Sequence, residues 1–177
     1  MNKKKIFRHI IGYTLGIPVF AFLIPLVLYK LSSIFDPYIK ISMIDNLNLR
    51  IIVSLPILII GLFFVIWSNI ALFRIGKGGP ADGFNIAISP RTEKLVIAGP
   101  YRYTRNPMVF GAFATYFSIG IYLNSLICLM VLILSLFLAI KYLKLTEEKR
   151  LYKDFGDEFL EYKKNVPMII PFTRRLK

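Results

Sequence analysis

The chain has 177 residues, of which 56% are hydrophobic, and its mean hydropathy is +0.61. That is too apolar for an ordinary soluble domain of this size, so the composition indicates an integral membrane protein. The formal net charge is +13, but the basic residues flank apolar stretches, where they are typical of topology signals rather than of nucleic-acid binding. We therefore expect one membrane domain over residues 1–177 and no nucleic-acid partner.

A single cysteine and a single histidine restrict the chemistry further. Cys128 lies inside an apolar run, which excludes a disulfide framework within the chain. His9 stands beside Arg8 in the basic N-terminus, where a contact with lipid headgroups is the simplest interpretation. Neither a cysteine-built nor a multi-histidine metal site can be formed, so we expect no metal.

Two charge-free stretches in the first 73 residues are long enough to cross a bilayer. Ile10–Tyr29 has about 20 residues, which at 1.5 Å per residue span a ~30 Å hydrocarbon core. A signal peptide is the alternative, but this run is longer than the usual apolar region and no small-residue cleavage site follows it. Ile51–Phe73 is the second span, and Lys30–Arg50 between them predicts a mixed loop. Pro18 and Pro25 predict kinks, which a bilayer tolerates when neighbours satisfy the freed carbonyls.

A polar stretch and then a very long apolar one follow. Arg74–Asn106 is rich in glycine and proline, which predicts an ordered irregular loop in which only Lys94–Ala98 could be extended. Pro107–Ile140 has no charge over 34 residues and as a single helix would be ~51 Å long, too long for one crossing. Asn124-Ser125 at its middle is a suitable turn, so we expect a helical hairpin over residues 107–143.

The C-terminal part predicts one more helix, over Thr146–Asn165. Its apolar residues form a stripe with spacings of four, four and three: Leu151, Phe155, Phe159 and Tyr162. Such a helix either lies on the membrane face or caps the preceding loop. Gly156 lowers its stability by up to ~1 kcal/mol.

Basic residues gather before the first span, in the 74–106 loop and after the hairpin. Because cytoplasmic segments carry an excess of lysine and arginine, about four transmembrane helices place all three segments and both termini in the cytoplasm. The expected fold is therefore an all-α, multi-pass integral membrane protein with an irregular cytoplasmic loop and a C-terminal cytoplasmic or interfacial helix. The small size and the lysine-, isoleucine- and asparagine-rich composition favour a prokaryotic plasma membrane.

Polar groups gather at both ends of the predicted hairpin, and folding back would bring them together. Arg102 and Arg105 can grip a carboxylate or phosphate, while Tyr101 offers an aromatic face and a hydroxyl. Glu147 and Glu148 can accept hydrogen bonds from an ammonium group or from ribose hydroxyls. A ligand with an anionic group, a cationic group and an aromatic ring would suit this set. S-adenosylmethionine is one such molecule, and a nucleotide cofactor would also fit.

Each of these groups also has a plainer interpretation. The arginines can be topology anchors at a helix start, and the tyrosines can belong to the interfacial aromatic belt. Glu147-Glu148 can favour the N-terminus of the following helix through its dipole, by ~0.3–1 kcal/mol. Taken separately, none of these residues identifies a function.

The joint pattern is more specific. The stretch Gly99-Pro100-Tyr101-Arg102-Tyr103-Thr104-Arg105-Asn106-Pro107-Met108, followed by Gly111, resembles the signature of the isoprenylcysteine carboxyl methyltransferase and phospholipid methyltransferase superfamily. In that superfamily an R-[HN]-P-x-Y-x-G element precedes a helical hairpin, and a pair of glutamates follows it. Arg105–Gly111 and Glu147-Glu148 match these elements.

The resemblance covers roughly Arg74–Pro171, so we expect a methyltransferase-like core over residues 74–171 after two N-terminal spans in residues 1–73. The Gly76–Pro80 turn and the segment that ends in Val166-Pro167 are similar as well. One departure stands out. The family tyrosine two residues after the motif proline is Val109 here, so a hydroxyl is missing at that position.

The resemblance implies a membrane methyltransferase that takes its methyl group from S-adenosylmethionine and transfers it to the polar end of a lipophilic acceptor. It implies two catalytic residues: Arg105 orients an acidic substrate group or the cofactor carboxylate, and Asn106 makes a polar contact near the methyl group. Seven residues are expected to bind the cofactor: Gly99, Tyr101, Arg102, Pro107, Gly111, Glu147 and Glu148. The expected partners are membrane lipids and a lipophilic small molecule or prenylated substrate.

Several functions remain open at this point. A carboxyl group on an isoprenylcysteine-like substrate is the first choice, because Gly99–Met108 is most similar to that branch. N-methylation of a phospholipid of the phosphatidylethanolamine type is the second. Sterol reductases share the arginine–proline and glutamate features but use NADPH and are far longer. A non-catalytic membrane protein that retains the fold is the last alternative.

Overall fold

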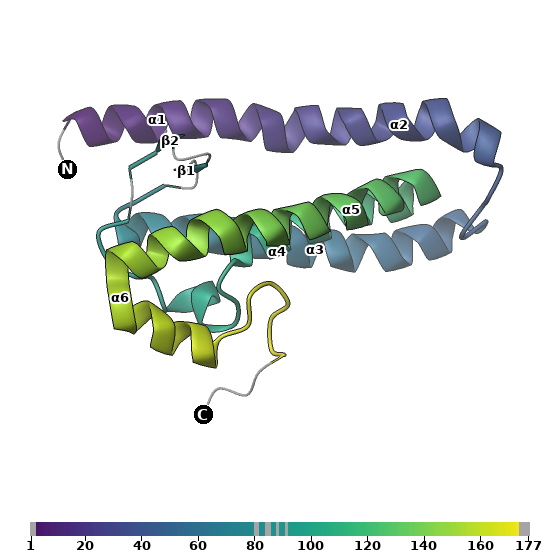
Figure 1. Cartoon of the computed structure of the whole chain (residues 1–177). Helices are drawn as coiled ribbons and strands as arrows, with labels where there is room; N and C mark the ends of the chain where they lie inside the picture. The colour runs from purple at the N-terminus through teal and green to yellow at the C-terminus, as the bar shows by residue number, and fades with distance from the viewer. Residues whose placement is uncertain (1–2, 80–81, 84–85, 88, 91, 174–177) are drawn as a thin grey trace.

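The computed structural model describes residues 3–79, 82–83, 86–87, 89–90 and 92–173, and most of them are helical (Figure 1). The α-helices are α1 (Lys3–Pro18), α2 (Ile24–Ile39), α3 (Leu47–Ala71), α4 (Pro107–Tyr122), α5 (Leu126–Tyr142) and α6 (Glu148–Asn165). Three π-helical turns and one 3₁₀ turn accompany them: η1 (Val19–Leu23), η2 (Leu72–Gly76), η4 (Leu143–Glu147) and η3 (Gly99–Arg102). A two-residue antiparallel ladder joins β1 (Asp82–Gly83) to β2 (Ile86–Ala87), whereas Lys94–Ala98 belongs to no ladder.

Within the described residues, three continuous helices are long and apolar enough to cross a membrane: Ile6–Ile39, Leu47–Gly76 and Leu126–Asn165. α4 is equally apolar, but its 16 residues reach only about 24 Å at 1.5 Å per residue. The expected all-α membrane fold is confirmed. The start of α1, the loop with β1 and β2, and α6 lie at the same end of the bundle, which we call the loop end (Figure 1).

The N-terminal helix runs from α1 through η1 into α2, and its prolines explain the π turn. In η1 the N–H of Ile24 bonds to the carbonyl of Val19, five residues back. Pro25 has no N–H, so in this register it cannot bond to the carbonyl of Phe20. The Tyr116 hydroxyl of α4 donates to that carbonyl at 3.0 Å. A neighbouring helix therefore satisfies the group that proline leaves, as the bilayer requires.

The expected loop over Lys30–Arg50 is wrong in its bounds, because α2 continues to Ile39. Lys40 then ends α2 in the left-handed conformation with φ 52°, and the Asn46 side chain caps the start of α3. The charged residues after Lys30 do not stop a helix that has reached the edge of the hydrocarbon. The charge-free run therefore underestimates the length of the helix.

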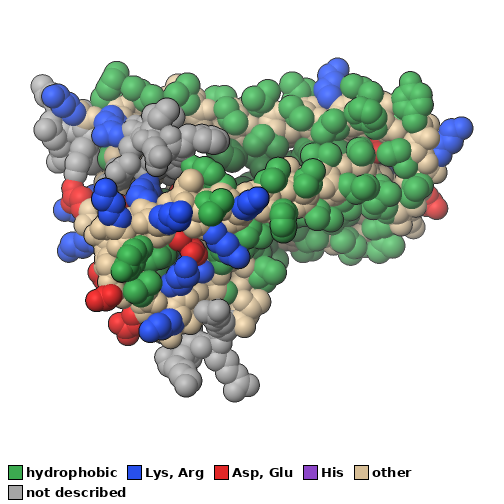
Figure 2. Space-filling view, in the orientation of Figure 1, with side chains coloured by type: hydrophobic (Ala, Val, Ile, Leu, Met, Phe, Trp, Pro, Cys, Tyr) green, Lys and Arg blue, Asp and Glu red, His purple; other side chains and the backbone are tan. Residues whose placement is uncertain are grey.

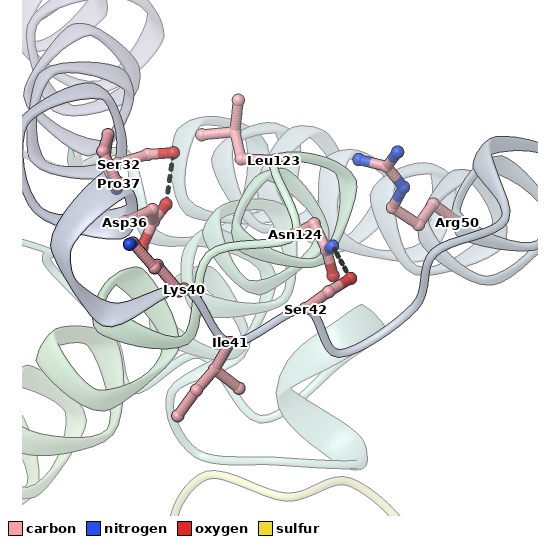
Figure 3. Close-up of a pocket in the computed structure, with 9 residues that line it drawn as sticks. All are labelled: Ser32, Asp36, Pro37, Lys40, Ile41, Ser42, Arg50, Leu123 and Asn124. Atoms are coloured by element: carbon pink, nitrogen blue, oxygen red, sulfur yellow. Dashed lines mark hydrogen bonds between the residues drawn. The ribbon is translucent and has the colours of Figure 1, made fainter.

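The hairpin turn lies at Asn124 and Ser125, as expected, and polar side chains fix it to residues 40–46 (Figure 3). The Asn124 amide oxygen accepts from two backbone N–H groups of that loop at 3.0 and 2.9 Å, and its nitrogen donates to Ser42 Oγ at 2.7 Å. The Ser125 hydroxyl donates to the Asp36 carboxylate at 3.0 Å. These bonds hold α2, α3 and the hairpin together at the end opposite to the loop end.

Two glycines allow α3 and α4 to touch along their length. A Cβ on Gly61 would lie 2.8 Å from the carbonyl oxygen of Gly111, and a Cβ on Gly111 would lie 2.6 Å from that of Gly61. Such small residues are the usual means by which membrane helices pack closely. Gly111 therefore fixes the position of α4, and with it the residues at the start of that helix.

α5 continues through η4 into α6, so the two separate helices expected over 126–143 and 146–165 form one helix with a break inside α6. The break is at Gly156, which has φ 54° and ψ −128°. The expected apolar stripe is confirmed as a buried surface made of Phe159, Tyr162 and Val166, packed against Leu95, Leu151 and Phe155. Because Leu95 belongs to the loop, α6 caps the loop, which is one of the two expected arrangements.

The expected contact of His9 with lipid headgroups is wrong. Only 5% of His9 is exposed, and its ring packs edge-on against Phe73 and is stacked with Tyr13 at centroid distances of 5.3 and 6.5 Å. Next to it, the Arg8 guanidinium donates to the carbonyl of Ser89 at 3.3 Å. The start of α1 is therefore docked on the loop.

The contact between α3 and α4 predicts that Gly61→Ala destabilises the protein, since the added Cβ meets the backbone of α4. We expect a loss of about 1–3 kcal/mol in the free energy of unfolding, measured by thermal or denaturant unfolding in detergent. Gly16→Ala is the matched control, because a Cβ on Gly16 meets nothing within 4 Å. Equal stability of the two variants would contradict this description of the helix contact.

Candidate functional site

The residues of the Gly99–Met108 stretch are held in place from both sides. Gly99 begins η3 with φ +64°, a conformation that favours glycine, and its Cα faces the Trp67 indole of α3. Thr104 and Pro107 are fully buried. The stretch is therefore an ordered part of the fold rather than a surface loop.

Hydrogen bonds clamp this stretch to the chain that follows α6. The backbone N–H of Arg105 donates to the carbonyl of Pro167 at 2.9 Å. The Thr104 hydroxyl and the Asn106 side-chain amide both donate to the carbonyl of Met168, at 3.1 and 2.9 Å. Three consecutive residues before α4 therefore bind two consecutive carbonyls that lie more than 60 positions further along the chain.

Arg105 also forms the central ion pair of the loop end. Its Nη1 lies 2.7 Å from Oε1 of Glu148, and Lys163 Nζ lies 2.6 Å from Oε2 of the same carboxylate. Only 10% and 12% of the Arg105 and Glu148 side chains are exposed. The two polar clusters at the ends of the hairpin do meet, as the sequence predicts.

A cavity of about 390 Å³ opens beside this ion pair, and Arg105 forms part of its wall. Three further residues singled out in the sequence line it: Tyr101, Asn106 and Glu147. Its apolar walls include Phe20 of η1, Leu72 of η2, Met108 and Ala112 of α4, and Ala139 of α5. The cavity thus has a polar part at the loop end and an apolar part between the helices.

Five other candidate residues do not line the cavity. Gly99 faces Trp67, Gly111 faces Gly61, and Pro107 is buried at the start of α4. Arg102 is exposed, and both carboxylate oxygens of Glu148 are occupied by cations. Their assignment as cofactor-binding residues stays a prediction, and the structure gives all but Arg102 a packing or pairing role.

Some cavity residues were not singled out from the sequence. Arg150 and Tyr142 are two of these. Val109, the departure from the family motif, also stands in the cavity wall. Arg150 could have been found, since its spacing of three from Glu147 places both on the same face of a helix. Nothing in the sequence connects Phe20 with this cavity.

The raised pKa of the Tyr101 hydroxyl favours its protonated form, which can donate a hydrogen bond in this site. Burial raises its pKa, and the neighbouring Tyr162 and Glu147 raise it further. The Tyr162 hydroxyl donates to the Tyr101 carbonyl at 2.6 Å, which fixes the backbone of Tyr101.

The cavity offers groups of both charge signs next to an apolar space. Arg105 and Arg150 are guanidinium groups that can bind a carboxylate, Glu147 can bind an ammonium group, and Tyr101 and Tyr142 supply aromatic faces and hydroxyls. A zwitterionic ligand with an aromatic part suits the polar walls, and an apolar chain suits the walls between the helices.

The family model described as phospholipid methyltransferase matches residues 49–158, which is well over half of the chain. The chain belongs to the phospholipid methyltransferase family. The family match begins in α3 and includes the loop, the hairpin and the first part of α6. The family membership inferred from the Gly99–Gly111 motif is thereby confirmed.

Curated proteins that are similar to this chain are also named as methyltransferases. A protein-S-isoprenylcysteine O-methyltransferase of Rattus norvegicus is 33% identical over 122 residues, which are 66% of this chain and 42% of the relative. The protein of that name from Homo sapiens is 38% identical over 88 residues, 49% of this chain and 30% of the relative. The matched part of this chain therefore spans at most about two fifths of these relatives. No solved structure matches the chain.

The shared carboxylate predicts that Glu148→Gln destabilises the protein, because the change removes the counter-charge of Arg105, whose side chain is only 10% exposed. We expect a loss of about 3 kcal/mol in the free energy of unfolding. Lys77→Met is the control, because the Lys77–Glu93 pair is long, at 3.8 Å, and 69% and 44% exposed. That variant should lose about 0–1 kcal/mol. Similar unfolding midpoints for both variants would contradict a structural role for Glu148.

Proposed function

We propose that this chain transfers a methyl group from S-adenosylmethionine to the polar end of a lipophilic acceptor, with the carboxyl group of an isoprenylcysteine-like molecule as the first choice. The observation that carries the proposal is the Arg105–Glu148 ion pair beside a cavity with charged and apolar walls. The names of the relatives support a methyl ester as the product.

The residues around the cavity fit the methyl donor. Arg105 or Arg150 can bind its carboxylate, Glu147 can bind its ammonium group, and Tyr101 can stack on its purine or donate to its ribose. The volume of about 390 Å³ lies within the range of ordinary ligand pockets. When bound, S-adenosylmethionine supplies a methyl group on a sulfonium sulfur, which needs no further activation.

The protein then has to orient the acceptor and keep water out. Arg105, held by Glu148 and by the Pro167 carbonyl, is a rigid guanidinium that can orient a carboxylate. The Asn106 nitrogen is used by Met168, so we assign the amide oxygen to the ligand. Alignment of this kind contributes at most ~7–11 kcal/mol to lowering a barrier. Apolar walls stabilise charges poorly. They therefore also favour this reaction, in which the carboxylate of the acceptor and the sulfonium of the donor both lose their charge.

We further propose that the loop end is cytoplasmic and that the membrane is a prokaryotic plasma membrane. On the face shown in Figure 2, most lysine and arginine side chains gather at the loop end, whereas hydrophobic side chains cover the helices. This distribution supports the orientation, since cytoplasmic segments are rich in basic residues. Phe20 and Leu72 stand in the cavity wall, which supports our proposal that residues 1–73 and 74–171 act as one domain.

The family description favours a second candidate, the N-methylation of a phospholipid amine. Both reactions would use the same donor at the same polar walls. They differ at the acceptor, because an amine has to lose a proton before it can attack, whereas a carboxylate does not.

We expect changes at two cavity residues to affect cofactor binding and methyl transfer separately. Glu147→Gln should weaken binding of S-adenosylhomocysteine about 10-fold or more, since one charge-assisted hydrogen bond is lost. Arg105→Lys should lower turnover about 100-fold by misplacing the acceptor. Isothermal titration and mass spectrometry of lipids and prenylated thiols incubated with labelled S-adenosylmethionine measure the two effects.

Glu161→Gln, on the exposed surface of α6, is the control and should match the wild type. Failure of the wild type to bind S-adenosylhomocysteine would identify a non-catalytic relative instead of an enzyme.

The acceptor can be identified from the pH dependence of the rate. Methylation of a carboxyl acceptor should be nearly constant between pH 6 and 8, because a carboxyl group with a pKa of about 4 is fully ionised there. Methylation of an amine should rise up to about tenfold per pH unit below the amine pKa, because only the neutral form attacks. Initial rates with an S-farnesyl cysteine derivative and with phosphatidylethanolamine vesicles, measured over this range, distinguish the two candidates.

A further inference from the structure

Among the described residues of the N-terminal helix, Phe20 in the π turn η1 lines the cavity. This helix is fixed to the rest of the molecule along its length. Arg8 donates to the loop, and further along Cys128 Sγ lies 3.2 Å from the Leu28 carbonyl and Ser125 donates to Asp36. The helix is therefore a fixed wall of the cavity.

The position of Phe20 is set by the hydrogen bond that its carbonyl receives from Tyr116. A π turn contains an extra residue, which rotates the side chains on its two sides relative to each other. Tyr116 is itself 6% exposed and packs in the core with Leu28 and Cys128. A buried tyrosine of α4 thus holds the turn that carries Phe20.

Phe20 lies both in the wall of the cavity and on the exposed surface of the bundle. It lines the cavity together with Ala112 of α4 and Ala139 of α5, yet 56% of its surface is exposed. The two alanines are small, so the cavity wall that Phe20 shares with them is apolar and leaves room for a ligand. An apolar chain that extends from the polar end of the cavity towards the lipid would pass between this ring and the alanines.

We propose that Phe20 is a specificity-determining residue that contacts the apolar chain of the acceptor where it leaves the cavity, and that Tyr116 is the residue that positions it. This inference rests on the proposed methyl transfer to a lipophilic acceptor. The contact stabilises long-chain acceptors and contributes nothing to acceptors whose chain is too short to reach the edge.

The test uses the full chain in lipid nanodiscs and compares S-farnesyl and S-ethyl derivatives of N-acetylcysteine as acceptors. Phe20→Ala should lower kcat/KM for the farnesyl acceptor roughly five- to tenfold, the effect of losing about half of an aromatic contact. The same variant should change kcat/KM for the ethyl acceptor by less than about twofold. Tyr116→Phe, which removes only the hydroxyl, should lower the farnesyl-to-ethyl ratio in the same direction by a smaller factor.

Phe22→Ala is the matched control, because Phe22 lies in the same turn, is 71% exposed and does not line the cavity. It should leave the farnesyl-to-ethyl ratio unchanged, and binding of S-adenosylhomocysteine should be the same in all variants. A ratio that stays at the wild-type value in Phe20→Ala, or that falls equally in Phe22→Ala, overturns the inference but leaves the proposed function intact. Absence of S-adenosylhomocysteine binding and of methylation in the wild type overturns the proposed function, and this inference with it.

Discussion

The carboxylate of Glu148 is the interaction on which the loop end depends. A carboxylate that is about nine-tenths buried needs neutralising partners, and Arg105 and Lys163 occupy one oxygen each. Arg105 precedes α4 and Glu148 begins α6, so the ion pair joins the two ends of the hairpin. The cavity lies beside this junction, and its charged walls keep their positions only while the junction holds.

Away from this ion pair, polar groups of the bundle form hydrogen bonds between helices at two other places along its length. In the middle of the helices, Tyr116 donates to the carbonyl that Pro25 leaves without a partner. At the turn end, Asn124 and Ser125 bind the 40–46 loop and Asp36. Because an unpaired polar group in hydrocarbon costs several kcal/mol, each of these bonds fixes the relative position of two helices.

The sequence was sufficient for the features that depend on composition and local pattern. A charge-free run of 34 residues with Asn124-Ser125 at its middle predicts a hairpin, and the hairpin in turn predicts that Arg105 and Glu148 meet. Contacts between distant segments that no hairpin brings together were not predictable. Gly111 was expected to approach a ligand, but the structure places it against Gly61, and no pattern in one sequence connects these two positions.

Charge patterns also misplaced some boundaries. Lys30 ends the apolar run but not the helix, because the backbone continues to bond regardless of the side chains that reach water. His9 was assigned to the headgroups because its neighbours are basic, yet it is buried between Phe73 and Tyr13. In both cases the sequence shows that the side chain is polar, whereas the folded structure decides whether it ends a helix or is buried.

The clamp between residues 104–106 and the carbonyls of Pro167 and Met168 has a consequence for biosynthesis. The chain leaves the ribosome from its N-terminus, so α1, α2 and α3, which end by Ala71, emerge before residues 167 and 168 are synthesised. Until those two carbonyls have emerged and folded back, Thr104 and Asn106 have no acceptor for their side-chain hydrogen bonds. The loop end, with the cavity beside it, is therefore completed only after the last part of the chain has been made.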